Sequence, residues 1–257
     1  MTDTPRLLFV GAGPGAPDLI TVRGQNALQA ADVVVYAGSL VNPALLENCK
    51  PGCEIYNSAP MTLEEITDVL IRAVNAGKSV VRLHTGDPSL YGAIREQMDI
   101  LDQHAIDYAV VPGVSSFLGA AAALKAELTL PSVSQTVILT RMEGRTKVPT
   151  KENMAGLARH GASMVIFLSM SLLKALTEEL LRGGYTKDTP AAIVYKATWP
   201  DEKTIHTTVG DLVDAAESHA ITKTALVLVG GFLGDGYAKS KLYDADFSHG
   251  FRKADTP

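Results

Sequence analysis

Short apolar runs alternate with helix-like segments along the first half of the chain, and this alternation limits the possible folds most strongly. Strands are predicted at residues 6–10, 32–36, 79–83 and 108–111. Strands separated by helices do not pair as hairpins, and they form instead a mostly parallel sheet with helices on both faces. The chain is therefore predicted to be an α/β protein.

Two of the intervening helices carry clear start signals. Thr21 is placed to cap the first helix. Thr62 is followed three residues later by Glu65, a pair typical of a capping box, and Gly77 is placed to end that helix. Further helices are expected over residues 91–104 and 115–126.

The alternation breaks near residue 128, where a second series of strands begins. These strands are expected at residues 136–140, 164–168, 191–195, 203–208 and 225–229, with a helix over 172–181. The last three have no predicted helix between them, which favours a mixed, partly antiparallel sheet. We therefore divide the chain into an N-terminal α/β domain, residues 1–128, and a C-terminal α/β domain, residues 129–257, with a peripheral tail. Ligands of α/β sheets collect beyond the carboxyl ends of strands, so a cleft between the two domains is the expected site.

Charge and apolar runs argue against several function classes. With 23 Lys and Arg against 28 Asp and Glu, the formal net charge is −5. This charge argues against a nucleic-acid-binding protein but leaves room for a local arginine cluster. No apolar run approaches the roughly 20 residues that span a membrane, and the first residues do not resemble a signal peptide. The two cysteines and six histidines show no spacing typical of a metal site. We expect a cytoplasmic protein without a bound metal.

The first predicted strand runs into a glycine turn, Gly11-Ala-Gly-Pro-Gly15, that partly matches a dinucleotide-binding fingerprint. Pro14 and Pro17 interrupt the segment where the helix of that fingerprint begins. The second strand ends at Tyr36 without the acidic residue that binds a ribose. The turn therefore argues against an NAD site, and a tight turn that needs only the freedom of glycine is the alternative.

A second loop, His84-Thr-Gly-Asp-Pro-Ser-Leu-Tyr-Gly92, follows the strand at 79–83. Gly86 permits close approach of the backbone to a ligand, and Asp87 supplies an acceptor. Asp87 is also suited to cap the helix that follows, and both interpretations stay open.

These two loops, together with Val111-Pro-Gly-Val-Ser-Ser116, resemble the tetrapyrrole methyltransferase family, which has a GxGPG turn, a GDP loop and a PG(I/V)(S/T) turn at similar separations. The resemblance extends from about Leu7 to Phe232. It implies two α/β domains with S-adenosylmethionine in the cleft between them, and an enzyme that is commonly a homodimer.

By position, the resemblance also implies a set of residues that touch S-adenosylmethionine. They are Pro14, Thr85, Gly86, Asp87, Leu90, Ser115 and Ser116 in the N-terminal domain and Leu168, Ala197, Thr224 and Ala225 in the C-terminal domain. Met170 is the alternative to Leu168, because the alignment can slip there. Several relatives have glycine at Thr85 and Ala197, so backbone contacts require φ angles that side chains tolerate.

Two stretches of the second half narrow the function. Residues 135–149 and 194–203 are similar to the subgroup that methylates C11 of precorrin-4, with or without cobalt, in cobalamin biosynthesis. The methyl group of a sulfonium is already electrophilic, so such an enzyme chiefly aligns it with a nucleophilic ring carbon and excludes water. No catalytic triad or strong base is therefore expected.

Precorrins carry many carboxylates, and arginine forks suit carboxylates well. Arg141 and Arg145 lie on one predicted loop, with Glu143 between them and Lys147 as a weaker candidate. We expect Arg141, Glu143 and Arg145 to bind the anionic tetrapyrrole, with His84 as a further contact. A solvated turn is the alternative for this loop.

Other functions stay open at this point. The nearest is methylation of another tetrapyrrole, uroporphyrinogen III or precorrin-2. Family members that modify translation factors or ribosomal RNA fit the acidic charge less well. From other classes, the missing ribose-binding acid argues against an NAD-dependent oxidoreductase, and the intact cofactor loops argue against a non-catalytic binding module.

Overall fold

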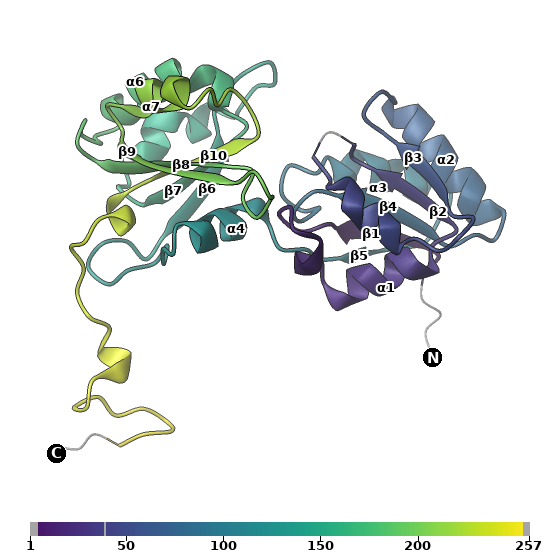
Figure 1. Cartoon of the computed structure of the whole chain (residues 1–257), viewed down its shortest axis with the longest axis horizontal. Coiled ribbons are helices and arrows are strands. Elements are labelled where there is room, and N and C mark those ends of the chain that lie inside the picture. Colours follow the sequence, from purple (N-terminus) through teal and green to yellow (C-terminus); the bar gives the residue numbers. More distant parts are fainter. Residues whose placement is uncertain (1–4, 39, 254–257) are drawn as a thin grey trace. The chain divides into compact units, whose positions relative to one another are not determined.

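The computed structural model of the chain describes residues 5–38 and 40–253. The chain forms two compact units, each with a five-stranded sheet (Figure 1). The first unit comprises Met1–Ala123 and the loop Lys196–Glu202, and the second comprises Leu124–Tyr195 and Lys203–Pro257. The predicted division after residue 128 lies close to this boundary but places the loop in the other domain. The difference arises because the loop packs on the glycine turn, as described below.

The first unit has a parallel sheet in the order β3-β2-β4-β1-β5. Its strands are β1 (Leu7–Gly11), β2 (Val33–Tyr36), β3 (Glu54–Asn57), β4 (Val80–His84) and β5 (Tyr108–Val111). Every pairing in it is parallel, as the alternation predicted. The strands β4, β1 and β5 are neighbours, so their carboxyl ends lie side by side.

Helices cover both faces of this sheet. They are α1 (Val22–Ala30), α2 (Leu63–Asn75) and α3 (Ile94–Gln103), while α4 (Ser116–Ala123) follows β5 in the chain. Leu70 of α2 and Leu101 of α3 are fully buried in the core on one face. Leu28 of α1 and Leu45 of the 3₁₀ helix Pro43–Asn48 are buried on the other. Full burial of one such side chain is worth about 1.5–3 kcal/mol.

The predicted start signals of α1 and α2 are confirmed. The Thr21 hydroxyl accepts the N–H of Gly24 at 3.1 Å. The Thr62 hydroxyl accepts the Glu65 N–H at 3.3 Å, and the Glu65 carboxylate accepts the Thr62 N–H at 2.7 Å, which completes the capping box. The glycine turn is followed by a three-residue 3₁₀ helix, Pro17–Leu19, and α1 begins only at Val22, so no α-helix starts at the turn as a dinucleotide fingerprint requires.

Two helices are shorter than the sequence predicted. The helix expected from residue 91 begins at Ile94, because Tyr91 and Ala93 adopt left-handed φ angles of +55° and +49°. The helix expected to reach residue 126 ends at Ala123, and Lys125 is left-handed at +54°. Left-handed residues cannot continue a right-handed helix.

The second unit has a mixed sheet, as predicted, and its strands lie in the order β6-β7-β10-β8-β9. Its strands are β6 (Val137–Arg141), β7 (Ser163–Phe167), β8 (Pro190–Tyr195), β9 (Lys203–Thr208) and β10 (Ala225–Val229). The pair β6 and β7 is parallel, and the other pairs are antiparallel.

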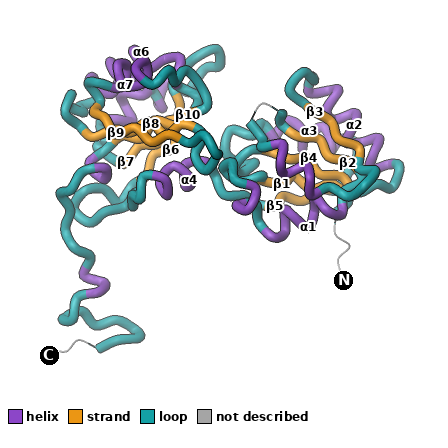
Figure 2. The backbone as a smooth tube through the Cα atoms, in the orientation of Figure 1, coloured by secondary structure: helices purple, strands orange, loops and turns teal. Residues whose placement is uncertain are grey.

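Helices α6 (Leu173–Arg182) and α7 (Leu212–Ser218) lie together over one face of this sheet (Figures 1 and 2), and α5 (Met154–Ala158) packs against α6. Leu176 and Leu180 of α6 and Leu212 of α7 are fully buried in its core. The described part of the tail after Gly236 has mostly exposed side chains. None of the described helices combines the length and the apolar character needed to cross a membrane.

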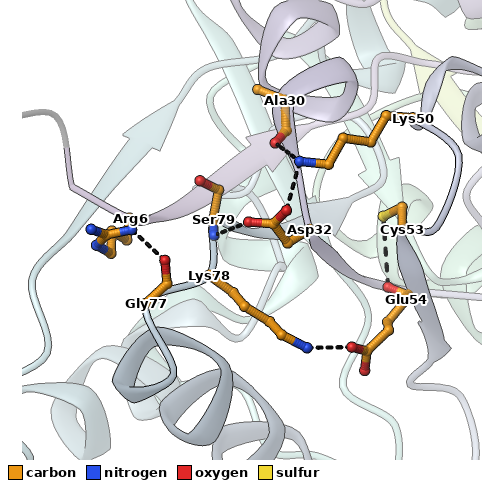
Figure 3. A network of polar contacts seen from close by, with 9 residues as sticks. All are labelled: Arg6, Ala30, Asp32, Lys50, Cys53, Glu54, Gly77, Lys78 and Ser79. Atoms are coloured by element: carbon orange, nitrogen blue, oxygen red, sulfur yellow. Dashed lines mark hydrogen bonds and ion pairs between the residues drawn. The ribbon is translucent and has the colours of Figure 1, made fainter.

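A polar network ties together the amino ends of the strands in the first unit (Figure 3). The Asp32 carboxylate, just before β2, accepts from Lys50 Nζ at 2.6 Å and from the Ser79 N–H, just before β4, at 2.8 Å. These two hydrogen bonds hold the pKa of Asp32 below its usual value. Lys78 and Glu54 form a second ion pair beside it. This end of the sheet is occupied by structural contacts, whereas the opposite end carries the three loops.

Candidate functional site

The three loops predicted to carry the function meet at one end of the first sheet. The glycine turn (residues 11–16) follows β1, the GDP loop (residues 84–92) follows β4, and the PG turn (residues 111–116) follows β5. The Gly13 N–H donates to the Gly86 carbonyl at 3.2 Å, and the Gly86 N–H donates to the Gly13 carbonyl at 2.8 Å. The first two loops are thus joined backbone to backbone.

Glycine is required where these loops touch. A Cβ atom at Gly113 would lie 2.2 Å from the Gly86 carbonyl oxygen and 2.8 Å from the Gly11 Cα. Gly13 and Gly86 have φ angles of +80° and +59°, in the region that favours glycine. Backbone groups rather than side chains therefore occupy the centre of this site.

Several residues implied by the resemblance lie around this centre. A Cβ atom at Gly86 would lie 3.5 Å from the Ser115 Cα and 3.4 Å from the Ser116 nitrogen. Pro14 packs against Gly119 of α4. Thr85 donates its hydroxyl hydrogen to the Leu40 carbonyl at 3.2 Å, so its hydroxyl is already engaged. Neither Thr85 nor Ala197 has a positive φ angle, so a residue with a side chain is tolerated at both positions where several relatives have glycine.

Asp87 connects the GDP loop to the PG turn. Its Oδ2 accepts the Gly113 N–H at 2.8 Å, and its Oδ1 accepts the Ser89 N–H at 2.9 Å and the Ser89 hydroxyl. Partial burial alone would raise the pKa of Asp87, but these hydrogen bonds outweigh it and lower the pKa. The alternative that Asp87 caps the following helix is wrong, because α3 begins at Ile94.

The loop Lys196–Glu202 packs on the glycine turn and places Ala197 there. A Cβ atom at Gly15 would lie 2.1 Å from the Trp199 ring and 3.0 Å from the Ala197 carbonyl. The Ala16 N–H donates to the Thr198 hydroxyl at 2.9 Å. Gly15 is therefore needed for close approach of Trp199, while its φ angle lies outside the left-handed region.

Sequence reasoning missed the residues that hold the glycine turn from outside. Asn42 donates to the Gly15 carbonyl at 2.9 Å, and nothing in the sequence signals this contact, 27 positions away. Thr198 and Trp199 were passed over as well. Trp199, the single tryptophan of the chain, could have drawn attention to its loop.

The remaining predicted cofactor residues lie at one end of the second sheet. Ala225 begins β10, and Leu168 directly follows β7, which pairs with β10 in antiparallel register. Leu168 and Thr224 are exposed and left-handed, with φ angles of +51° and +57°. Each such strained residue costs on the order of 1–3 kcal/mol, and strain of this kind concentrates at functional sites.

Met170, the alternative to Leu168 as a cofactor contact, is less well supported. Leu168 is 64% exposed, whereas Met170 is 8% exposed and packs in the core of the second unit. A buried core side chain is poorly placed to contact a ligand. We therefore keep Leu168.

Arg141 ends β6 at the same end of the sheet, paired in register with Phe167. Its guanidinium donates to the carbonyls of its own loop, at 3.2 Å to Met142, 3.1 Å to Thr146 and 2.9 Å to Lys147. Arg141 thus organises residues 142–147. The side chains of Glu143, Arg145, Thr146 and Lys147 on this loop are exposed.

His84, predicted as a substrate contact, lies in the core instead. It is 4% exposed, and its ring centroid lies 6.1 Å from that of Phe9. Burial, and then the charge of Arg82, lower the pKa of His84 to about 3, so the ring is neutral. Its Nε2 has no hydrogen-bond partner among the described residues. A ring enclosed in this way does not reach a large substrate, and we leave His84 out of the substrate-binding set. The described residues also contain no group of three or more His, Cys, Asp or Glu side chains that could hold a metal ion.

The family model for Tetrapyrrole (Corrin/Porphyrin) Methylases matches residues 6–213 of the chain. The chain belongs to this family. Among curated relatives, this methylase is 54% identical over 255 residues to the cobalt-precorrin-4 C(11)-methyltransferase of Methanocaldococcus jannaschii, covering 99% of this chain and 98% of the relative. It is 46% identical to the precorrin-4 C(11)-methyltransferase of Pseudomonas aeruginosa, covering 95% and 97%.

Solved structures agree with the family's fold. The methylase matches the X-ray structure of a cobalamin biosynthetic enzyme, cobalt precorrin-4 methyltransferase, with a TM-score of 0.87, 51% identity and coverage of 89% and 96%. It also matches uroporphyrin-III C-methyl transferase from Thermus thermophilus complexed with S-adenyl homocysteine, with a TM-score of 0.72, 27% identity and coverage of 89% and 93%. The α/β fold implied by the resemblance is confirmed.

Proposed function

We propose that this chain transfers a methyl group from S-adenosylmethionine to C11 of precorrin-4, in its free or cobalt-bound form, during cobalamin biosynthesis. The observation that carries the proposal is the 54% identity, over nearly the full length of both chains, to an enzyme named for this reaction. Methylation of uroporphyrinogen III is the less favoured alternative, because the enzyme compared above with that name shares 27% identity.

The cofactor contacts are part of the proposal. The residues are Pro14, Thr85, Gly86, Asp87, Leu90, Ser115, Ser116, Ala197, Leu168, Thr224 and Ala225. The first unit fits such a ligand because Gly86 and Gly113 keep the three loops free of side chains at their centre. The exposed, strained Leu168 and Thr224 support the contribution of the second unit.

Bound S-adenosylmethionine supplies an electrophilic methyl group. The protein's task is then to align the ring carbon with that methyl group and to exclude water. The Asp87 hydrogen bond to Gly113 and the backbone pairing of Gly13 with Gly86 keep the cofactor loops in one arrangement. We assign no catalytic base, since a ring carbon of enamine character brings its own electron pair.

Substrate recognition is assigned to the loop after β6. Arg145 is exposed and is the proposed fork for a substrate carboxylate, with Lys147 as a second cation. Arg141 holds the loop carbonyls, so it acts on the substrate mainly by shaping this loop. Glu143 lies among these cations and is proposed to orient them or to accept from a pyrrole N–H.

The cobalt-bound substrate is the favoured form. The relative named for cobalt-precorrin-4 is 54% identical, and the one named for metal-free precorrin-4 is 46% identical. A comparison of kcat/KM on both substrates tests this preference. A higher value on the metal-free form would contradict it.

We further propose that the enzyme is a cytoplasmic homodimer. The support is the resemblance to a family that commonly forms homodimers, and the use of a cofactor made in the cytoplasm. Light scattering coupled to gel filtration would reveal a monomer if this is wrong, and cell fractionation tests the location.

One experiment decides the reaction. The purified protein is incubated with methyl-labelled S-adenosylmethionine and cobalt-precorrin-4, and the product is examined by mass spectrometry and carbon NMR. The expected product carries one added methyl group at C11. A label at another ring position, or no transfer despite cofactor binding, would contradict the assignment.

A further inference from the structure

A buried arginine lies beneath the GDP loop. Arg82, in β4, is 5% exposed and forms no ion pair with a carboxylate within the described parts of the chain. Its Nε donates to Gln97 Oε1 at 3.0 Å, and its Nη1 donates to the Val35 carbonyl at 3.2 Å. A buried cation without a countercharge is costly, and its hydrogen bonds must therefore compensate for lost water.

The Gln97 side chain links Arg82 to the backbone at the end of the GDP loop. The Gln97 side chain is buried on α3, and its Nε2 donates to the Ala93 carbonyl at 3.1 Å. An arginine can only donate hydrogen bonds, so Arg82 requires the Gln97 oxygen to face it. The amide nitrogen is thereby directed to the Ala93 carbonyl. Arg82 fixes which way the amide points.

The segment held in this way is strained. Tyr91 and Ala93 both have left-handed φ angles, and a Cβ atom at Gly92 would lie 2.2 Å from the Pro88 carbonyl oxygen. Such a conformation persists only where the surrounding contacts hold it. Asp87 holds the loop near its beginning, and Gln97 holds the residue that follows its end.

We propose that Arg82 and Gln97 are positioning residues for methyl transfer, which keep the GDP loop in its cofactor-binding conformation through the Ala93 carbonyl. Both side chains are buried and act through the loop backbone. The inference rests on the proposed function, because it takes the GDP loop as part of the cofactor site. It adds to that function a buried guanidinium–amide pair on which cofactor affinity depends.

The substitution Gln97→Glu separates positioning from support of the core. A glutamate keeps an acceptor for Arg82 and gives it a countercharge, so the thermal unfolding temperature should be unchanged or higher. It lacks the side-chain N–H that Gln97 donates to the Ala93 carbonyl in addition to the backbone hydrogen bond of the helix. Calorimetry should therefore show about fivefold to tenfold weaker S-adenosylhomocysteine binding, the effect of one lost hydrogen bond. The KM for the cofactor should rise, while the KM for the corrinoid stays within about twofold.

Two further variants complete the test. Gln103→Glu changes the charge equally at the exposed end of α3 and should bind as the wild type does. Arg82→Lys keeps the charge but loses the fork, and should weaken cofactor binding in the same direction as Gln97→Glu.

The outcomes are distinguishable. A wild-type protein that does not bind S-adenosylhomocysteine contradicts the proposed function. A wild type that binds, with Gln97→Glu binding equally well, overturns only the positioning role. Loss of stability in Gln97→Glu also overturns it, because the amide would then serve the core rather than the loop.

Discussion

At the scale of single residues, the structure changes the role of the motif carboxylate. From the sequence, Asp87 is an acceptor for the cofactor. In the structure both of its oxygens already accept hydrogen bonds, from Gly113 and Ser89. Its main effect is therefore to hold two loops together, and any ligand contact uses its remaining lone pairs.

Replacing Asp87 with asparagine should weaken both folding and cofactor binding. An amide can accept on one side only, so the Gly113 or the Ser89 donors lose a partner, at about 1–3 kcal/mol. Because the pKa of Asp87 is lowered on folding, its contribution is complete above its unfolded value of 3.8 and is lost as the pH falls through the folded value. Urea titrations should show the gap between wild type and variant closing as the pH falls below 3.8. A gap that persists in strong acid would contradict the assignment.

Replacing Gly15 with alanine should displace Trp199. The added Cβ would lie 2.1 Å from the ring, so the loop Lys196–Glu202 must move away from the glycine turn. Because Trp199 is the single tryptophan, its fluorescence reports this movement directly, as a shift to longer wavelength. Cofactor affinity should fall with it. Gly236→Ala, where a Cβ atom would meet nothing within 4 Å, is the matched control and should leave both signals unchanged.

At the scale of elements, those with strong local signals were predicted and those without were not. The capping box of α2 and the buried strands β4 and β10 follow from their own residues. Strand β3 was missed, because all four of its residues are exposed at the sheet edge and leave no burial pattern. The five-residue α5 and the seven-residue α7 are too short for a helical period to show.

Loss of the capping box should destabilise the first unit without affecting catalysis. Thr62→Ala removes the acceptor for the Glu65 N–H, at a cost of about 1 kcal/mol. Thermal and urea unfolding should register this loss. The KM values for cofactor and corrinoid should remain those of the wild type, since α2 carries none of the proposed site residues. A raised cofactor KM would show that the helix and the site are coupled.

At the scale of the whole molecule, the sequence could indicate which loops matter but not how their side chains are engaged. The three loops come together because parallel strands β4, β1 and β5 are neighbours, a consequence of topology that the motifs already imply. By contrast, the burial of His84 and the inward hydrogen bonds of Arg141 depend on rotamers and distant carbonyls. No local pattern encodes these contacts.

Charge at this scale also leads to the prediction that tests the substrate site. A net charge of −5 disfavours a polyanionic substrate, so the cations of the loop after β6 must attract it locally. Arg145→Ala should raise the corrinoid KM by the equivalent of about 1.5–3 kcal/mol, the value of a charge-assisted hydrogen bond. Calorimetric S-adenosylhomocysteine affinity should stay at the wild-type level. Added salt should raise the wild-type KM and affect the variant less, because exposed charges are screened beyond about 8–10 Å.

Arg159→Ala, an exposed arginine after α5, removes the same charge elsewhere and serves as the control. If Arg145→Ala and Arg159→Ala share one KM and one salt dependence, the corrinoid is anchored somewhere other than this loop.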